Sequence, residues 1–179
     1  MEQTYMNLKD QVKRPVFDAN KIDRNHPAFV KFVNQYISWV NSVDKISDND
    51  KLPYENEIIS CFKEHDLDGY NLAKHIYDIT GMEPDAWLVD ILDNAESVKR
   101  QMYNDILKQW IKENFLTIPK DCIGKKVNAK QNFEYKNQYI TGISHDTYQV
   151  NICPNRDKLG CGYLINFENI EFVNETNDV

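Results

Sequence analysis

The chain has 179 residues, of which 21 are lysine or arginine and 28 are aspartate or glutamate, so its formal net charge at pH 7 is -7. This length is enough for one compact domain or for two small domains that share an interface. The negative charge argues against a general attraction to the phosphate backbone of nucleic acids, and it favours basic partners.

The beginning of the chain contains no apolar segment of the kind found in secretory signals, and no apolar run reaches the length that spans a bilayer. We therefore expect a cytoplasmic protein. Because nothing marks the chain for secretion, its four cysteines are expected to be thiols rather than a disulfide framework. They are Cys61, Cys122, Cys153 and Cys161.

Residues 1–24 mix charged and apolar side chains without a clear period, so we expect an arm that packs on the body or orders on a partner. The first helical pattern covers residues 27–43, where apolar residues recur at the spacing of one helix face. A second helix is predicted over residues 53–64, after a polar loop.

Residues 66–116 carry the strongest structural signals in the chain. Asp68 is placed to cap the first turn of a helix, and Gly81 suits the left-handed residue that ends one. Pro84 then suits the first turn of a long helix with a continuous apolar stripe. Such a length without an internal cap is unusual, so we expect a break or kink near residues 93–94.

The four predicted helices together indicate a small acidic bundle over residues 25–118. Within it, GYNLAKHIYDITGMEPDAWLVDILD is followed by KQWIKENFLTIPKDCIGKKV. This order resembles a pattern in uncharacterised proteins of bacteriophages and other bacterial mobile elements, in which a helical GYxLAK…PDxxLVxILD segment precedes a small Src-homology-3-like β domain. The resemblance covers residues 66–127 and implies a fold and a biological setting, with no assigned activity.

After Ile118 and Pro119 the apolar period changes from that of helices to that of strands. Five short strands are predicted, at residues 125–130, 139–144, 147–153, 161–167 and 171–173. Gly142 in the second strand is expected to mark a bulge or a sharp bend. The pattern resembles a small barrel of the Src-homology-3 or KOW/Tudor type. The predicted fold class is therefore α+β, with the four-helix acidic bundle followed by a five-stranded barrel over residues 119–174 and a tail of residues 175–179.

Negative charge concentrates in the predicted helical half. Residues 1–118 hold 14 basic and 20 acidic side chains, whereas residues 119–179 hold seven and eight. The densest acidic stretch, residues 44–68, has two interpretations. One is a solvated helix face with acids near helix N-termini, where the dipole favours them. The other is a surface that occupies a basic, nucleic-acid-binding groove of a partner through Asp48, Asp50, Glu55, Glu57, Glu64 and Asp66.

Aromatic side chains and lysines are interleaved in the predicted barrel. Barrels of this kind often present aromatic residues as a ligand platform or cation cage. Lysines beside them would neutralise single-stranded nucleic acid while its bases stack on the rings. Core packing explains the same aromatic residues equally well. The candidate residues of this surface are Lys125, Lys126, Tyr135, Tyr139 and Tyr148.

Cys61 and His65 are four residues apart on one predicted helix, the spacing of a thiolate–imidazole pair. The sequence identifies no third group that would orient the histidine and no oxyanion donor. A half-buried helical cysteine is therefore the preferred interpretation.

Cys153 and Cys161 flank a loop, and Cys122 and His145 are conceivable third and fourth zinc ligands. The two flanking cysteines lack the tight CxxC spacing by which zinc sites are recognised. We expect no metal and no cofactor, although the sequence leaves zinc binding by these four residues open.

The sequence thus predicts a non-enzymatic interaction protein of phage or mobile-element setting. Its most concrete form is an inhibitor whose acidic face docks on a basic bacterial nucleic-acid machine, such as a CRISPR effector or another defence complex. The alternative is a small nucleic-acid-binding accessory protein that acts through the barrel. An enzyme that uses Cys61 or Cys153 is a third interpretation.

Overall fold

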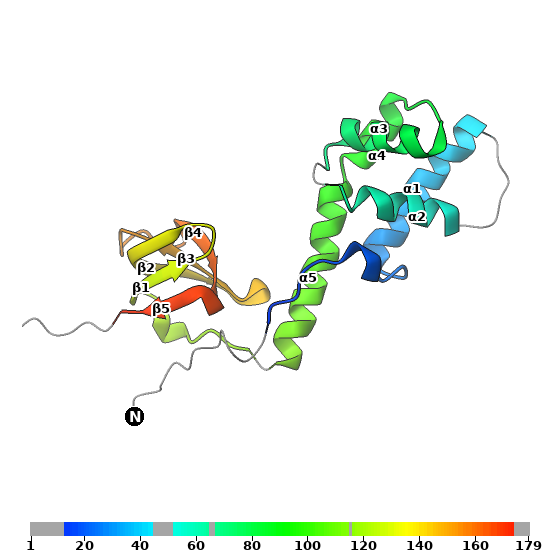
Figure 1. The fold of residues 1–179 in the computed structure, drawn as a ribbon. Helices are drawn as coiled ribbons and strands as arrows, with labels where there is room; N and C mark the ends of the chain where they lie inside the picture. The colour runs from blue at the N-terminus through cyan, green and yellow to red at the C-terminus, as the bar shows by residue number, and fades with distance from the viewer. Residues whose placement is uncertain (1–12, 45–51, 65–66, 115, 174–179) are drawn as a thin grey trace, which may run out of the picture. The chain divides into compact units, whose positions relative to one another are not determined.

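A computed structural model describes residues 13–44, 52–64, 67–114 and 116–173. The chain forms two compact units, Val16–Asp105 and a second that combines Ile106–Val179 with the segment Met1–Pro15. The first unit is helical and the second is built on a five-stranded sheet (Figure 1). The α+β class is therefore confirmed, while the predicted domain limits near residues 24 and 118 stay predictions.

The described part of the chain contains five α-helices. They are α1 (Pro27–Asp44), α2 (Leu52–Cys61), α3 (Gly69–Thr80), α4 (Ala86–Leu92) and α5 (Ala95–Glu113), the last of which continues into the second unit. α2 ends earlier than predicted, because the N–H groups of Lys63 and Glu64 donate to carbonyls three residues back in a turn. None of these described helices has both the length and the apolar character needed to cross a bilayer.

Capping residues set the limits of α3 as predicted. The side chain of Asp68 accepts hydrogen bonds from the backbone N–H groups of Tyr70 and Asn71, at 3.0 and 3.2 Å. At the other end Gly81 adopts a left-handed conformation with φ of 73°, and its N–H donates to the Tyr77 carbonyl. Both capping predictions are confirmed.

The long helix predicted after Pro84 is divided into α4 and α5. Asp93 and Asn94 lie in the turn between them, and Asn94 Nδ2 donates to the Asp90 carbonyl at 2.9 Å. Asn and Asp side chains compete with the helical backbone for hydrogen bonds, which favours a turn at this point. The expected break is confirmed, and it explains why five helices stand where four were predicted.

Aromatic rings fill the centre of the helical unit. The ring of Phe62 lies 6.3 Å from those of Phe17 and Phe29 and 5.9 Å from that of Phe32, measured between centroids. Trp39, further along α1, is fully buried. Burial of each such side chain contributes roughly 2–3 kcal/mol, so this cluster is a main source of stability. Phe17 belongs to the predicted arm, and this part of the arm packs on the body.

The second unit contains β1 (Lys126–Lys130), β2 (Glu134–Ser144), β3 (Gln149–Cys153), β4 (Tyr163–Asn166) and β5 (Ile170–Phe172). Neighbouring strands are antiparallel in the order β4-β3-β2-β1-β5. This order leaves β4 and β5 at the edges, so the sheet is not closed. All five predicted strands are present. β2 begins earlier than predicted, because its first part pairs with β1, as at Tyr135 and Ala129.

Gly142 lies at an irregularity in the pairing of β2 with β3, as predicted. The register shifts between Ile140 and Gly142, which is the position of a bulge. A Cβ atom at Gly142 would lie 3.3 Å from the Cα of Gly160, so the backbones approach closely here. β2 therefore serves both halves of the sheet, pairing with β1 before the irregularity and with β3 around it.

Candidate interaction surfaces

The predicted acidic face is engaged within the helical unit where the structure describes it. Arg24 Nη1 lies 2.6 Å from Glu55 Oε2 in an ion pair. Glu64 Oε1 lies 3.5 Å from His75 Nδ1. The other predicted residues are Glu57, which is also engaged, and Asp48, Asp50 and Asp66, which lie outside the described residues.

Glu57 accepts a hydrogen bond from the Tyr36 hydroxyl at 2.6 Å. Partial burial raises the pKa of the Glu57 carboxyl, and the hydrogen bond from Tyr36 opposes this shift. Burial and the same hydrogen bond raise the pKa of Tyr36. Glu57 therefore supports packing between α2 and α1. Because reversal of its charge would disturb this packing, a loss of binding in such a variant would not show that Glu57 contacts a partner.

A second acidic stretch, residues 75–98, holds six acidic residues and no lysine or arginine. Three of the six have contacts: Asp85 with Trp39, Asp93 with the backbone of Gly69, and Glu96 with Arg100. Three others, Asp78, Glu83 and Asp90, are exposed, and their carboxylates have no hydrogen-bond or ion-pair partner in the described part of the chain. These three are the acids that remain available to a partner.

Two exposed aromatic rings lie on the helices that carry two of these acids. Tyr77 precedes Asp78 on α3 and is 42% exposed, and Trp87 on α4 is 46% exposed. Trp87 and Asp90 are three residues apart, so they share one side of α4. We call Asp78, Glu83, Asp90, Tyr77 and Trp87 the acidic surface. Sequence reasoning missed it because it considered only the density of acidic residues. The available signal was the absence of lysine and arginine between Lys74 and Lys99.

The structure brings together part of the predicted barrel surface. Lys126 and Tyr139 are partners in the pairing of β1 with β2, so both lie on the same face of the sheet, and both are partly exposed. Lys125 is adjacent in sequence, but its ammonium group lies 3.2 Å from Asp121 Oδ2 and 5.9 Å from the ring centroid of Phe172.

Tyr135 and Tyr148 lie elsewhere. Tyr135 pairs with the buried Ala129, which places it on the inner face of the sheet, and its ring packs 4.9 Å from that of Tyr163. Tyr148 is 2% exposed and packs against Trp110 and Phe167. Tyr148 therefore belongs to the core rather than to an exposed platform.

The structure reveals one arrangement that sequence reasoning missed, a chain of polar side chains from α2 to α3. Ser60 Oγ lies 3.0 Å from His75 Nε2, and His75 Nδ1 lies 3.5 Å from Glu64. This order resembles a nucleophile, a base and an orienting acid. However, the Ser60 hydroxyl donates its one proton to the Glu57 carbonyl at 2.6 Å, and the N–H groups of Lys63 and Glu64 are used in the following turn. In this arrangement the Ser60 proton is not directed at His75, and these two N–H groups are not available to an oxyanion.

Two of the cysteines, Cys61 and Cys122, have thiols whose pKa is raised. Burial, with the nearby charges of Glu64 and Glu57, raises the pKa of Cys61 to about 12, and His65 lies outside the described residues. Burial raises the pKa of Cys122 to about 11.

The four candidate zinc ligands differ in their surroundings. Cys122 and Cys153 are buried, whereas Cys161 and His145 are exposed. Among the described residues, no three histidine, cysteine, aspartate or glutamate side chains are placed to hold a metal ion.

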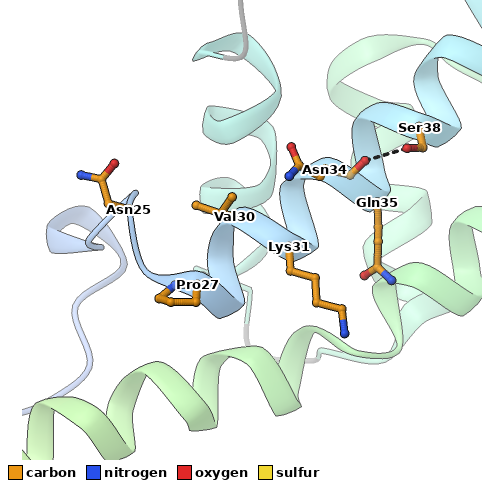
Figure 2. Close-up of a pocket in the computed structure, with 7 residues that line it drawn as sticks. All are labelled: Asn25, Pro27, Val30, Lys31, Asn34, Gln35 and Ser38. Carbon is orange, nitrogen blue, oxygen red and sulfur yellow. Dashed lines mark hydrogen bonds between the residues drawn. The ribbon is translucent and has the colours of Figure 1, made fainter.

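A shallow hollow lies along the outer side of α1. It is lined by Asn25, Pro27, Val30, Lys31, Asn34, Gln35 and Ser38. Figure 2 shows Lys31 and Gln35 extending in the same direction from the helix, while Ser38 donates to the Asn34 carbonyl at 2.9 Å. Lys31 is the one charged residue in this lining, so the hollow has no group of titratable side chains that could carry out chemistry.

The charge of the chain divides along the two units. Val16–Asp105 holds nine basic and 17 acidic residues, a net charge of -8, whereas the rest of the chain holds 12 and 11, a net charge of +1. The helical unit therefore carries the negative charge of the whole protein. The charges of the two units, -8 and +1, differ more than those of residues 1–118 and 119–179, which are -6 and -1.

No protein-family model, curated protein sequence or solved structure matches this chain.

Proposed function

We propose that this chain is a non-enzymatic interaction protein whose helical unit docks on a basic surface of a nucleic-acid-handling bacterial complex. In its most concrete form it is an inhibitor of phage or mobile-element setting that acts in the cytoplasm, and its partner is a CRISPR effector or another defence complex. The observation that carries the proposal is the charge of -8 on Val16–Asp105, combined with exposed carboxylates that have no partner there among the described residues.

Proteins that hold nucleic acid present clustered lysine and arginine side chains to phosphate groups. A protein surface with exposed carboxylates competes for the same side chains, and its field accelerates the encounter. Trp87 and Tyr77 add the aromatic contact area that dominates binding energy at many interfaces. Because Glu55 and Glu57 hold the fold together, the acidic surface defined by Asp78, Glu83 and Asp90 is the better docking site.

The test is a triple charge reversal on the acidic surface, Asp78→Lys, Glu83→Lys and Asp90→Lys. A tagged protein is used to capture partners from a bacterial lysate treated with nuclease, and captured proteins are identified by mass spectrometry. We expect the wild-type chain to retain a basic nucleic-acid-handling complex and the triple variant to lose it, because three attractive contacts become repulsive.

A matched control reverses three exposed acids of the other unit, Glu134→Lys, Asp146→Lys and Asp157→Lys. This variant has the same net charge as the first but leaves the acidic surface intact, so it is expected to capture the partner. If the control loses the partner to the same degree, overall charge rather than this surface is responsible. Retention by both variants would refute docking through the acidic surface.

We interpret the sheet as a small barrel of the Src-homology-3 or KOW/Tudor type. Three features support this interpretation: the strand order, a 3-10 turn η5 (Phe167–Asn169) before the last strand, and the sharing of β2 between both halves. A further contact reaches across the open side, because the side chain of Gln131, in the β1–β2 loop, accepts a hydrogen bond from the N–H of Asn166 in β4 at 2.9 Å.

The second candidate function is nucleic-acid binding by this barrel-like unit. It is favoured by the net charge of +1 on the unit and by the position of Lys126 and Tyr139 as partly exposed neighbours on one face of the sheet. The variant Lys125→Glu/Lys126→Glu should then weaken binding of a fluorescent single-stranded oligonucleotide roughly 10-fold, while the acidic-surface triple variant binds it unchanged or better. Oligonucleotide affinity that is equal in wild type and the lysine variant would exclude this function.

A further inference from the structure

The side chain of Arg14 is held by the sheet unit through an unusually complete set of contacts. Its Nε and Nη2 donate to the two carboxylate oxygens of Glu168. Nη1 donates to the Thr147 carbonyl at 3.0 Å, and Nη2 also donates to the Tyr148 carbonyl at 2.9 Å. The guanidinium carbon lies 5.3 Å from the ring centroid of Trp110.

These contacts match the shape of a guanidinium group. Two parallel donors on a carboxylate and a flat cation over an indole ring are arrangements that arginine makes and lysine does not. The side chains of Arg14 and Glu168 are only 13% and 14% exposed, so the pair is poorly screened by solvent. We call Glu168, the carbonyls of Thr147 and Tyr148, and the Trp110 ring the arginine pocket.

The pocket rests on a buried aromatic cluster. The rings of Trp110 and Tyr148 lie 5.9 Å apart edge to face, and Phe167 packs on the other side of Tyr148 at 5.5 Å. Trp110 Nε1 and the Tyr148 hydroxyl are buried without a hydrogen-bond partner in the described part of the chain. Burial and the charge of Glu168 raise the pKa of Tyr148 to about 12, so its hydroxyl keeps the proton.

Arg14 reaches the pocket on an extended segment rather than from a helix or strand. Residues 13–15 have no regular secondary structure, and Pro15 disfavours the helical conformation at Arg14. The pocket therefore receives an arginine from an extended peptide, which is the form in which another protein could also present one.

We propose that the arginine pocket is a recognition site for an arginine side chain in an extended segment of a partner protein, and that Arg14 occupies it within the same chain until a partner replaces it. The inference goes beyond docking through the acidic surface and does not depend on it. A basic partner supplies arginine side chains, so the two sites could act on the same protein.

The covalent link to the chain gives Arg14 an advantage over a free ligand. Its effective concentration at the pocket is on the order of millimolar, so free peptides well below that concentration cannot displace it. The pocket is therefore masked in the wild-type protein, and an experiment that seeks binding must first remove the internal arginine.

The test uses the full-length variant Arg14→Ala and the probe N-acetyl-L-arginine methylamide. The indole N–H signal of Trp110, assigned with Trp110→Phe, is followed by NMR, and the melting temperature is measured in parallel. In Arg14→Ala, about 10 mM probe should shift this signal and raise the melting temperature by about 3 °C. Wild-type protein should need a higher probe concentration for the same changes, because Arg14 competes for the pocket. The corresponding lysine and citrulline probes should have no effect on either protein.

The double variant Arg14→Ala/Glu168→Gln should lose at least about 10-fold in affinity for the arginine probe, because the bidentate carboxylate is gone. If Arg14→Ala does not fold, Arg14→Lys provides the same readouts, since the ammonium keeps the charge but not the two parallel hydrogen bonds. The proposal is overturned if, in a folded variant, about 50 mM arginine probe changes neither the Trp110 signal nor the melting temperature. It is also overturned by equal binding of the lysine probe, or if neither variant folds with the probe present.

Discussion

The backbone N–H of Gly69 donates a hydrogen bond to Asp93 Oδ1 at 2.8 Å, which joins the first residue of α3 to the turn between α4 and α5. A Cβ atom at position 69 would lie 2.4 Å from that oxygen and 2.5 Å from the Val89 carbonyl oxygen. The break in the long helix and the glycine at the start of α3 are therefore two parts of one contact.

Gly69→Ala should destabilise the helical unit by about 2 kcal/mol, because the methyl group overlaps a backbone carbonyl that cannot move without shifting α4. Urea unfolding followed by circular dichroism measures the change. Lys74→Ala, on the exposed side of α3, is the matched control and should change stability by less than about 0.5 kcal/mol. A neutral or stabilising Gly69→Ala would contradict the close approach, since alanine is otherwise preferred in helices.

Asp85→Ala should cost about 2 kcal/mol of stability, because Asp85 Oδ1 accepts hydrogen bonds from both the Leu88 N–H at 2.8 Å and the indole N–H of Trp39 at 2.9 Å. The loss has two components, a helix cap and a buried donor without a partner. In a Trp39→Phe background the donor is absent, so the same substitution should cost only about 1 kcal/mol. Equal costs in both backgrounds, measured by denaturant unfolding, would show that the indole contact contributes nothing.

Glu57 should make the protein less stable as the pH rises. The pKa of its carboxyl is raised above 4.5 in the folded state, so the unfolded chain releases the proton first and the free energy of unfolding falls until the folded pKa is passed. Glu57→Gln cannot titrate. Its stability relative to wild type should therefore increase between about pH 4 and pH 7, as measured by urea unfolding at several pH values.

Tyr36→Phe is the matched variant for this prediction. It removes the hydrogen bond that lowers the pKa of Glu57, so the fall in stability should extend to higher pH than in wild type. A stability difference between wild type and Glu57→Gln that does not vary with pH would contradict the raised pKa.

The four thiols should react with Ellman's reagent in two groups. Cys161 is exposed and should react first, whereas Cys61 and Cys122 are buried with pKa values raised to about 12 and about 11. At pH 8 we expect one thiol to react in a fast phase. The other three should react with rate constants at least about 100-fold lower. Cys161→Ser should abolish the fast phase, and denaturant should make all four thiols react. A fast phase that persists in Cys161→Ser would place another thiol at the surface.

The local parts of the fold were predictable from sequence because their causes are local. Asp68 and Gly81 cap α3, the break falls at Asp93 and Asn94, and Gly142 lies at the irregularity of β2. Asp68 and Asn94 act through side-chain hydrogen bonds, and Gly81 acts through its left-handed conformation. Gly142 acts by leaving room for the backbone of Gly160.

The sites were less predictable because their residues meet only through the tertiary fold. Glu57 was a candidate for docking, but Tyr36, 21 residues earlier, occupies its carboxylate. Tyr148 was a candidate for an exposed platform, but Trp110 and Phe167 cover it. Residue type and spacing give no information on such distant partners, so exposure could not be separated from burial before the structure was known.

The contact between Arg14 and Glu168 spans 154 residues, and both belong to the sheet unit. The helical unit lies between them in the sequence, as one continuous stretch. During synthesis on a ribosome, Val16–Asp105 can fold as soon as it emerges, whereas Arg14 must wait for Glu168 in the turn between the last two strands. Until then its guanidinium is free for other acidic groups, so the order in which the chain is translated separates the maturation of the two units in time.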